Sequence, residues 1–161
     1  MLGSRSDYAA VRSRFAWNVP THFNIGVDVC DKWADDPDRL ALMHRRRDGS
    51  RRDYTFAQIK RLSNRFANVM RRHGIRRGDR VGILLPQSPE TAIAHVATYK
   101  MGGIAVPLFT LFGVDALEYR LGNCAAKALV TDKEGAAKIA EIRDLLPALE
   151  YVYVIDGPPD H

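Results

Sequence analysis

The pattern of hydrophobic positions changes between two periods along most of the chain. Over residues 56–73, large apolar side chains recur every three or four positions, which predicts an amphipathic helix. The segment RVGILL at 80–85 is a short apolar run without alternation, typical of a strand buried on both faces of a parallel sheet. Similar pairs of segments follow, so we expect an α/β protein.

Helices and strands are expected to alternate four times after residue 55. The expected strands are 80–85, 104–109, 127–132 and 151–155. The expected helices are 56–73, one that begins at Pro89 and ends before Gly102, 114–124 and 135–146, the last closed by Pro147. This alternation favours parallel βαβ units with right-handed crossovers. Pro107 cannot donate to a ladder, so its strand is expected to lie at a sheet edge or to lose its pairing there.

Capping residues mark the expected helix ends. Thr55 and Gln58 have the spacing of a capping box, and Gly74 follows the same helix where a left-handed backbone is favoured. Ser88 is placed to cap the next helix, with Pro89 at its first position. That helix would use a slim apolar face formed by Ala92, Ile93, Val96 and Ala97.

The first 55 residues have a different organisation. Residues 1–22 lack a sustained period and are expected to form an N-terminal arm, extended or with a short helix, ahead of one α/β unit at 23–161. Helical spacing of Val27, Cys30 and Trp33 predicts one short helix, which Pro37 stops. Two extended pieces around Asp48-Gly49 predict a short β-hairpin.

Composition limits the class of protein. With 161 residues, 46% of them hydrophobic and 27% charged, the chain has the size and content of one globular domain. Its formal net charge of +5 is concentrated at 44–53 and 71–80. Each run surrounds a glycine turn without interleaved aromatic residues, which favours solvated surfaces. A basic nucleic-acid-binding domain stays open as an alternative; its binding would fall steeply with salt.

Cysteine usage and hydropathy address the location of the protein. Cys30 and Cys124 are far apart and lack the spacing of a zinc site or a disulfide framework. No apolar run approaches the ~18 residues of a membrane span. The opening residues lack the apolar core of a signal peptide. These features predict a cytoplasmic protein without a membrane span.

The sequence offers no catalytic constellation and no metal site. The five histidines make no metal spacing, and the glycine-rich phosphate motifs and the nucleophile elbow are absent from the sequence. His95 is expected to be a packing or surface residue. Ligand candidates are therefore the strand-to-helix turns 86–90, 109–113 and 131–135, because ligands of parallel sheets lie beyond the carboxyl ends of the strands.

The turn at 109–113 has an unusual composition. Phe109, Leu111 and Phe112 are large and apolar in a segment that is ordinarily polar. They either pack against another layer of the protein or line an apolar channel. The sequence pattern alone favours packing.

Three long segments resemble a known family. FNIGVDVCDKWA, the stretch from YTFAQIKRL to GGIAVPL, and DALEYRLGNCAAKALVTD are similar to the N-terminal part of the AMP-forming acyl-CoA synthetases, within the adenylate-forming enzymes. The opening FNIGVDVCDKWA and the loop PLFTLFG look most like the acetyl and medium-chain acyl-CoA synthetases. The resemblance covers roughly residues 23–156.

The resemblance implies an activity for a longer enzyme. It implies a ligase that uses ATP, Mg and CoA to convert a carboxylic acid into an acyl-CoA through an acyl-adenylate, releasing AMP and pyrophosphate. The family's phosphate loop, its Mg-holding acidic residue, its ribose-binding Asp and its C-terminal Lys are not found in these 161 residues. We therefore expect an incomplete N-terminal subdomain that alone is inactive and binds no cofactor tightly.

The resemblance also suggests one binding site. The family's loop at this position approaches the pantetheine arm of CoA, which implicates Thr110, Leu111, Phe112 and Gly113. The expected partners are the acid, ATP, CoA and the remainder of a synthetase chain, with self-association of the isolated piece and no specific nucleic acid. The segment 78–95 is expected to act as a rigid scaffold. A stand-alone flavodoxin-like α/β binding module, with a pocket at a turn, remains the other alternative.

Overall fold

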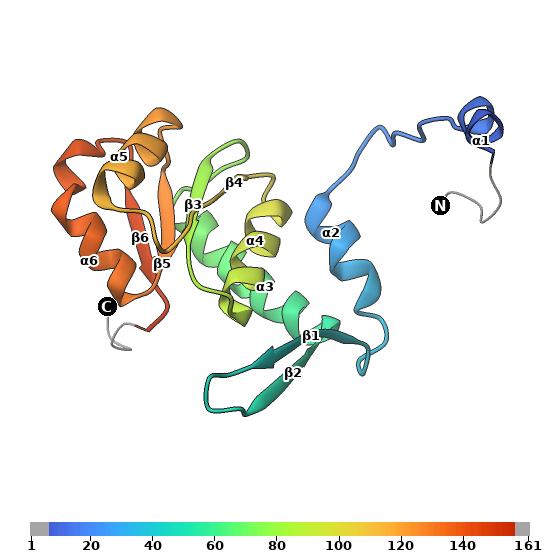
Figure 1. The fold of residues 1–161 in the computed structure, drawn as a ribbon, viewed down its shortest axis with the longest axis horizontal. Helices are drawn as coiled ribbons and strands as arrows, with labels where there is room; N and C mark the ends of the chain where they lie inside the picture. The colour runs from blue at the N-terminus through green and yellow to red at the C-terminus, as the bar shows by residue number, and fades with distance from the viewer. Residues whose placement is uncertain (1–6, 157–161) are drawn as a thin grey trace.

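The computed structural model describes residues 7–156 and contains a four-stranded parallel sheet (Figure 1). Its strand order is β4-β3-β5-β6. The strands are β3 (Arg80–Leu84), β4 (Ile104–Pro107), β5 (Ala128–Thr131) and β6 (Tyr151–Val154). The α/β class and the four parallel strands predicted from the sequence are confirmed. Pro107 ends β4, and β4 lies at the edge of the sheet, as a residue without an N–H requires.

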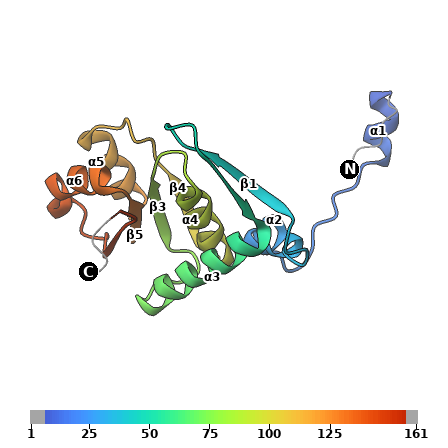
Figure 2. The ribbon, with the colours of Figure 1, turned by 90° about the horizontal axis from the view of Figure 1, so that it is seen from below.

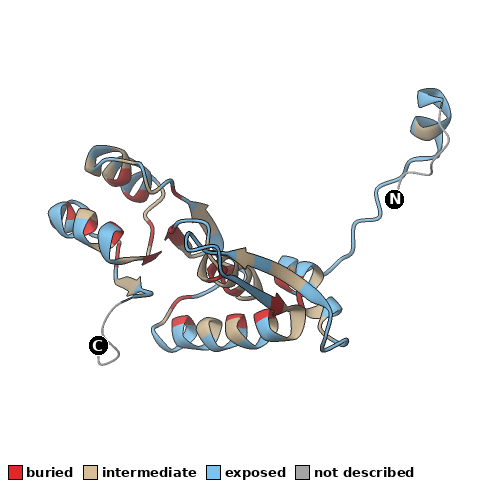
Figure 3. Ribbon diagram, turned by 60° about the horizontal axis from the view of Figure 1, so that its bottom comes forward, coloured by how far each residue is buried: buried red, intermediate tan, exposed pale blue. Residues whose placement is uncertain are grey.

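Helices cover both faces of this sheet. On one face lie α3 (Phe56–Arg72) and α4 (Pro89–Lys100); on the other lie α5 (Val114–Asn123) and α6 (Lys133–Glu141), followed by the 3₁₀ helix η2 (Arg143–Leu145). Figure 3 shows buried residues on the sheet and on the helix faces turned toward it. The predicted βαβ layers are therefore present, with a core on each side.

Strand β3 shows why both faces are apolar. Val81 and Ile83 pack among residues of α3 and α4, whereas Leu84 packs among residues of α5 and α6. Successive side chains of a strand point to opposite faces, so a strand between two helical layers needs apolar residues at every position. The unbroken run RVGILL meets this need.

Local capping predictions are confirmed by hydrogen bonds. The Thr55 hydroxyl accepts from the Gln58 N–H at 3.3 Å, and the Gln58 side chain accepts from the Thr55 N–H at 2.9 Å. Ser88 caps α4 ahead of Pro89. Gly74 has a φ of +81°, the left-handed conformation expected after α3.

The N-terminal third joins the sheet through α3 and α4. The predicted hairpin consists of β1 (Leu40–Arg45) and β2 (Arg51–Thr55), paired antiparallel. Figure 2 shows it lying beside α4 and the beginning of α3. The predicted arm contains α1 (Tyr8–Arg14), which lies apart from the sheet in both views (Figures 1 and 2).

Three sequence-based predictions need correction. The single helix expected before Pro37 is split into α2 (Ile25–Val29) and a 3₁₀ helix, η1 (Asp31–Trp33), because the backbone of Cys30 leaves helical geometry. The helix expected at 135–146 begins at Lys133, because Asp132 caps it, and its α-helical part stops at Glu141.

The third correction concerns the apolar face of α4. Ala94, Ala97 and Thr98 are its buried residues next to the sheet, whereas Ile93 and Val96 pack against the cluster of Cys30, Tyr54 and Ile59. Helix α4 therefore packs against the sheet on one side and against the Cys30 cluster on another, and this explains why its apolar residues do not form a single stripe. Within residues 7–156, every helix is too short or too polar to traverse a lipid bilayer.

Candidate functional site

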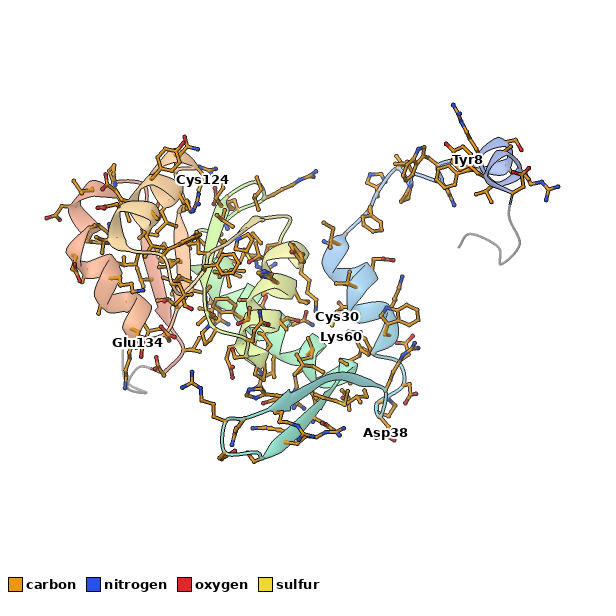
Figure 4. The ribbon with its side chains drawn as sticks, in the orientation of Figure 1. Tyr8, Cys30, Asp38, Lys60, Cys124 and Glu134 are labelled. Carbon is orange, nitrogen blue, oxygen red and sulfur yellow. The ribbon has the colours of Figure 1, made fainter. Side chains whose placement is uncertain are left out.

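Three strand-to-helix turns meet at one edge of the sheet. Strands β3, β4 and β5 run parallel, so their carboxyl ends lie together, and the turns 86–90, 109–113 and 131–135 follow them. The structure thus brings together the segments that the sequence singled out as ligand candidates. In Figure 4, Glu134 lies at this edge, at the beginning of α6.

The turn at 109–113 divides its apolar residues between packing and exposure. Phe109 and Leu111 are 73% and 91% exposed, whereas Phe112 is half-buried against the core beneath α5 and α6. The Phe109 and Phe112 rings meet edge to face with centroids 5.6 Å apart. Packing therefore explains one of the three residues, and the other two present apolar surface to solvent.

Side chains from two helices hold this turn. The Lys138 ammonium on α6 donates to the carbonyl oxygens of Thr110 at 2.7 Å and Phe112 at 3.1 Å. The Arg120 guanidinium on α5 lies 4.5 Å from the centre of the Phe112 ring, within cation–π range. Gly113 then caps α5, whose Leu117 N–H donates to the Gly113 carbonyl.

The neighbouring turn between β5 and α6 is tightly packed. The buried Thr131 hydroxyl donates to the Leu84 carbonyl at 3.0 Å, and Asp132 accepts from the Gly135 N–H at 2.8 Å. A Cβ atom at Gly135 would lie 1.9 Å from the Thr131 Oγ1, so this position has room only for glycine. The cavity beside these residues is about 20 Å³, the space of one water molecule.

This small cavity bears on the flavodoxin-like alternative. In the order β4-β3-β5-β6, the chain direction across the sheet reverses between β3 and β5, where such a module would hold its ligand. The cavity there is lined by Leu84, Thr110, Asp132, Glu134, Gly135 and Lys138 and is too small for a cofactor. The described residues therefore give this alternative no support at its expected site.

A larger groove lies on the other face of the sheet. It has a volume of about 550 Å³ and runs between α3, the beginning of α4 and strands β5 and β6. Its lining is mostly apolar and consists of Phe66, Val69, His73, Glu90, Ile93, Ala94, Val130, Tyr151, Val152, Tyr153, Val154 and Ile155. This groove was not predicted from the sequence.

Aromatic rings form one wall of the groove. Tyr151 and Tyr153 project to the same side of β6, and the His73 ring stacks with both at centroid distances of 4.9 and 5.7 Å. The His73 Nδ1 and the Tyr153 hydroxyl oxygen are 3.0 Å apart, and Phe66 meets Tyr153 edge to face. Burial, with a smaller contribution from the Tyr151 phenol, raises the pKa of Tyr153 to about 12. Its phenol is therefore neutral at physiological pH.

His95 follows the sequence-based expectation of a packing residue. Its ring is half-buried and lies 5.9 Å from that of Tyr99. Burial lowers the pKa of His95, which keeps the imidazole neutral at pH 7. The arginines of the first basic run are exposed around the hairpin tip, and those of the second are exposed in the last turn of α3 and in the loop after it, except Arg80. Arg80 is half-buried on β3 and donates to the Cys124 and Ala125 carbonyls.

Lys138 and Arg120 were missed by the sequence analysis. In the sequence, each is a cation on an amphipathic helix with no sign of a partner. They meet Thr110 and Phe112 only because the chain crossovers place α5 and α6 beside the turn 109–113. The sequence contained a weak signal for the aromatic wall. Tyr151 and Tyr153 alternate with valines along the last strand, so both tyrosines face the same side of the sheet.

Comparisons with known proteins agree on the family. The sequence model of the family described as "AMP-binding enzyme" matches residues 30–161. The chain is 37% identical to the acetyl-coenzyme A synthetase of Bacillus subtilis over 156 residues, 94% of this chain and 26% of that protein.

Solved structures give the same result. The crystal structure of an acyl-CoA synthetase from Brucella canis has a TM-score of 0.80 and 31% identity, covering 98% of this chain and 28% of that chain. The anthranilate CoA ligase AuaEII in complex with anthranoyl-AMP has a TM-score of 0.77 and 32% identity, covering 85% of this chain and 26% of that chain. The present chain thus spans about a quarter of the length of these relatives.

Proposed function

Because the chain belongs to the AMP-binding enzyme family, we propose that its complete protein is an AMP-forming acyl-CoA synthetase. The observation that carries this proposal is the 37% identity to an acetyl-coenzyme A synthetase over 94% of the chain. In the proposed reaction, a carboxylate oxygen of the substrate attacks the α-phosphorus of ATP and pyrophosphate leaves. The CoA thiolate then attacks the acyl carbon and AMP leaves.

We propose that ATP, Mg and CoA are used by the complete enzyme and that these residues form its N-terminal scaffold. Charge neutralisation on the phosphates is the main requirement of the first step. The isolated 161-residue chain is expected to be inactive, as the sequence analysis indicated. Exchange of labelled pyrophosphate into ATP tests this directly: the complete enzyme should catalyse it with an acyl substrate, and exchange by the 161-residue chain would overturn the scaffold proposal.

Within this scaffold, we propose that Thr110, Leu111, Phe112 and Gly113 contact CoA. The turn lies at the carboxyl edge of the sheet, where α/β enzymes bind ligands, and Leu111 is 91% exposed there. The pantetheine arm of CoA is a flexible, partly apolar chain, and an exposed leucine on a held turn offers it apolar contact. The Thr110 and Phe112 carbonyls of the turn already accept hydrogen bonds from Lys138.

The substitution Leu111→Asp in the complete enzyme tests the CoA contact. It should raise the KM for CoA about tenfold or more, because it replaces an apolar contact by a charge that repels the CoA phosphates, and should leave the KM for ATP within about twofold. Leu145→Asp is the matched control, since Leu145 is 57% exposed on η2, outside the turn. An unchanged CoA response in Leu111→Asp would reject the assignment.

Two further proposals come from the sequence analysis. We propose a cytoplasmic location, supported by the lack of a disulfide between Cys30 and Cys124, the two cysteines of the sequence. We also propose that the basic runs have no specific nucleic-acid partner and that the isolated chain associates with itself. Binding to short duplex DNA should be weak, independent of sequence and lost at moderate salt.

A further inference from the structure

We propose that Lys138 is a positioning residue for the turn 109–113 and that it sets the enzyme's response to CoA without touching the reacting atoms. This inference rests on the proposed CoA contact of that turn. The inference adds to that contact a residue on α6, which lies 25 or more positions after the turn in the sequence.

Lys138 joins two carbonyls that would otherwise lack a donor. The Thr110 and Phe112 oxygens both accept from its ammonium, at 2.7 and 3.1 Å. Among the backbone hydrogen bonds outside helices and strands of residues 7–156, neither carbonyl accepts from an N–H group. An ammonium has three donors and makes charge-assisted hydrogen bonds, which are stronger than neutral ones. One side chain therefore fixes the orientation of two peptide groups in this turn.

The Phe112 ring also restrains the turn. It is half-buried against the core, with Arg120 on its face and Phe109 at its edge. With Lys138 holding the carbonyls of the residues before and after Leu111, the turn has fixed backbone positions at 110 and 112. Leu111 between them is consequently held outward, at 91% exposure.

Removing the ammonium leaves two partly buried carbonyls without partners, and the turn can then fold toward the core or sample other conformations. A ligand that binds to one of these conformations loses affinity in proportion to its population. The loss should fall on CoA and spare ATP, because the turn carries only the CoA contact.

Two measurements on the complete enzyme test this inference. Hydrogen exchange at the Phe112 amide, which donates to the Phe109 carbonyl within the turn, should be about tenfold faster in Lys138→Met. The KM for CoA should rise about tenfold, equivalent to the loss of one charge-assisted hydrogen bond, with kcat and the KM for ATP within about twofold. Lys138→Arg should restore both values, because a guanidinium also donates to two oxygens.

The matched control is Arg72→Met, which removes the same charge from an exposed position in the last turn of α3, on the other face of the sheet, and should change neither measurement. Unchanged exchange at Phe112 in Lys138→Met would overturn the inference. Faster exchange with an unchanged KM for CoA would also overturn it, and would leave the proposed function standing if Leu111→Asp still raises that KM. If neither variant alters the KM for CoA, the proposed CoA contact fails and the inference fails with it.

Discussion

The Lys100 ammonium lies 2.6 Å from the Asp31 Oδ1, and both side chains are largely buried, at 9% and 19% exposure. The same ammonium lies 2.9 Å from the Ser63 hydroxyl and 2.7 Å from the side-chain Oδ1 of Asn64 on α3. The backbone carbonyl of Lys100 accepts from the side-chain Nδ2 of Asn24 at 3.0 Å. The end of α4 is thereby fastened to α3 and to the α2–η1 segment; Figure 4 labels Cys30 and Lys60 at this junction.

We predict that Lys100→Met destabilises the protein by about 3–5 kcal/mol, because it leaves the Asp31 carboxylate buried without its cation. The midpoint of urea unfolding measures this change. The double variant Asp31→Asn with Lys100→Met should be less destabilised than the sum of the two single variants, since the two groups interact directly. Lys32→Met is the control, because Lys32 pairs with Asp28 at an exposed position. If the destabilisation of the double variant equalled the sum of the two single variants, Lys100 and Asp31 would not interact as a buried pair.

Gly135→Ala should destabilise the protein by about 1–3 kcal/mol. The added Cβ would lie 1.9 Å from the Thr131 Oγ1 and 2.9 Å from the Leu84 side chain, so the turn between β5 and α6 must move. Thermal unfolding measures the effect, and adding Thr131→Ala should recover part of it by removing the clashing hydroxyl. In Gly122→Ala, the control within α5, the nearest atom to the new Cβ is 3.9 Å away, and stability should rise slightly. Equal effects at the two glycines would exclude a steric cause.

The pKa of Tyr153, raised to about 12, predicts a change of stability at alkaline pH. The ordinary tyrosine value of about 10 applies in the unfolded chain, so the folded state holds the phenolic proton more tightly. This contribution is complete below pH 10 and is lost as the pH rises through 12. Absorbance titration of tyrosinate should show a component near pH 12 that Tyr153→Phe removes and Tyr8→Phe, at an exposed ring, retains. A titration unchanged by Tyr153→Phe would contradict the assignment.

Strand β6 predicts self-association of the isolated chain. It pairs with β5 along one edge, and among residues 7–156 no strand pairs with its other edge. Open edge strands form hydrogen bonds with other chains, and a lysine at the edge discourages this. Sedimentation velocity should show a mass that increases with concentration and falls toward the monomer in Val154→Lys, whereas Val19→Lys on the N-terminal arm should not matter. A wild-type chain that stays monomeric at all concentrations would contradict this prediction.

Much of the fold was predictable because its signals are local. The capping box of α3 needs only Thr55 and Gln58, and a strand buried on two faces must be apolar at successive positions. The exceptions depended on distant partners. Helix α4 divides its apolar side chains between the sheet and the cluster around Cys30, a division that its own periodicity does not contain.

The sequence by itself determined the order of helices and strands, the parallel sheet and the turn 109–113 as an unusual apolar segment, and it limited the strand with Pro107 to a sheet edge or a loss of pairing. Each follows from chemistry within a few residues, where chain connectivity fixes the neighbours. Only the tertiary structure decided which of Phe109, Leu111 and Phe112 is buried, and that Lys138 supports them. It also decided the aromatic groove along β6 and the burial of Lys100 against Asp31. These features join groups that are remote in sequence, and their distances, exposure and charge environment arise only when the layers pack.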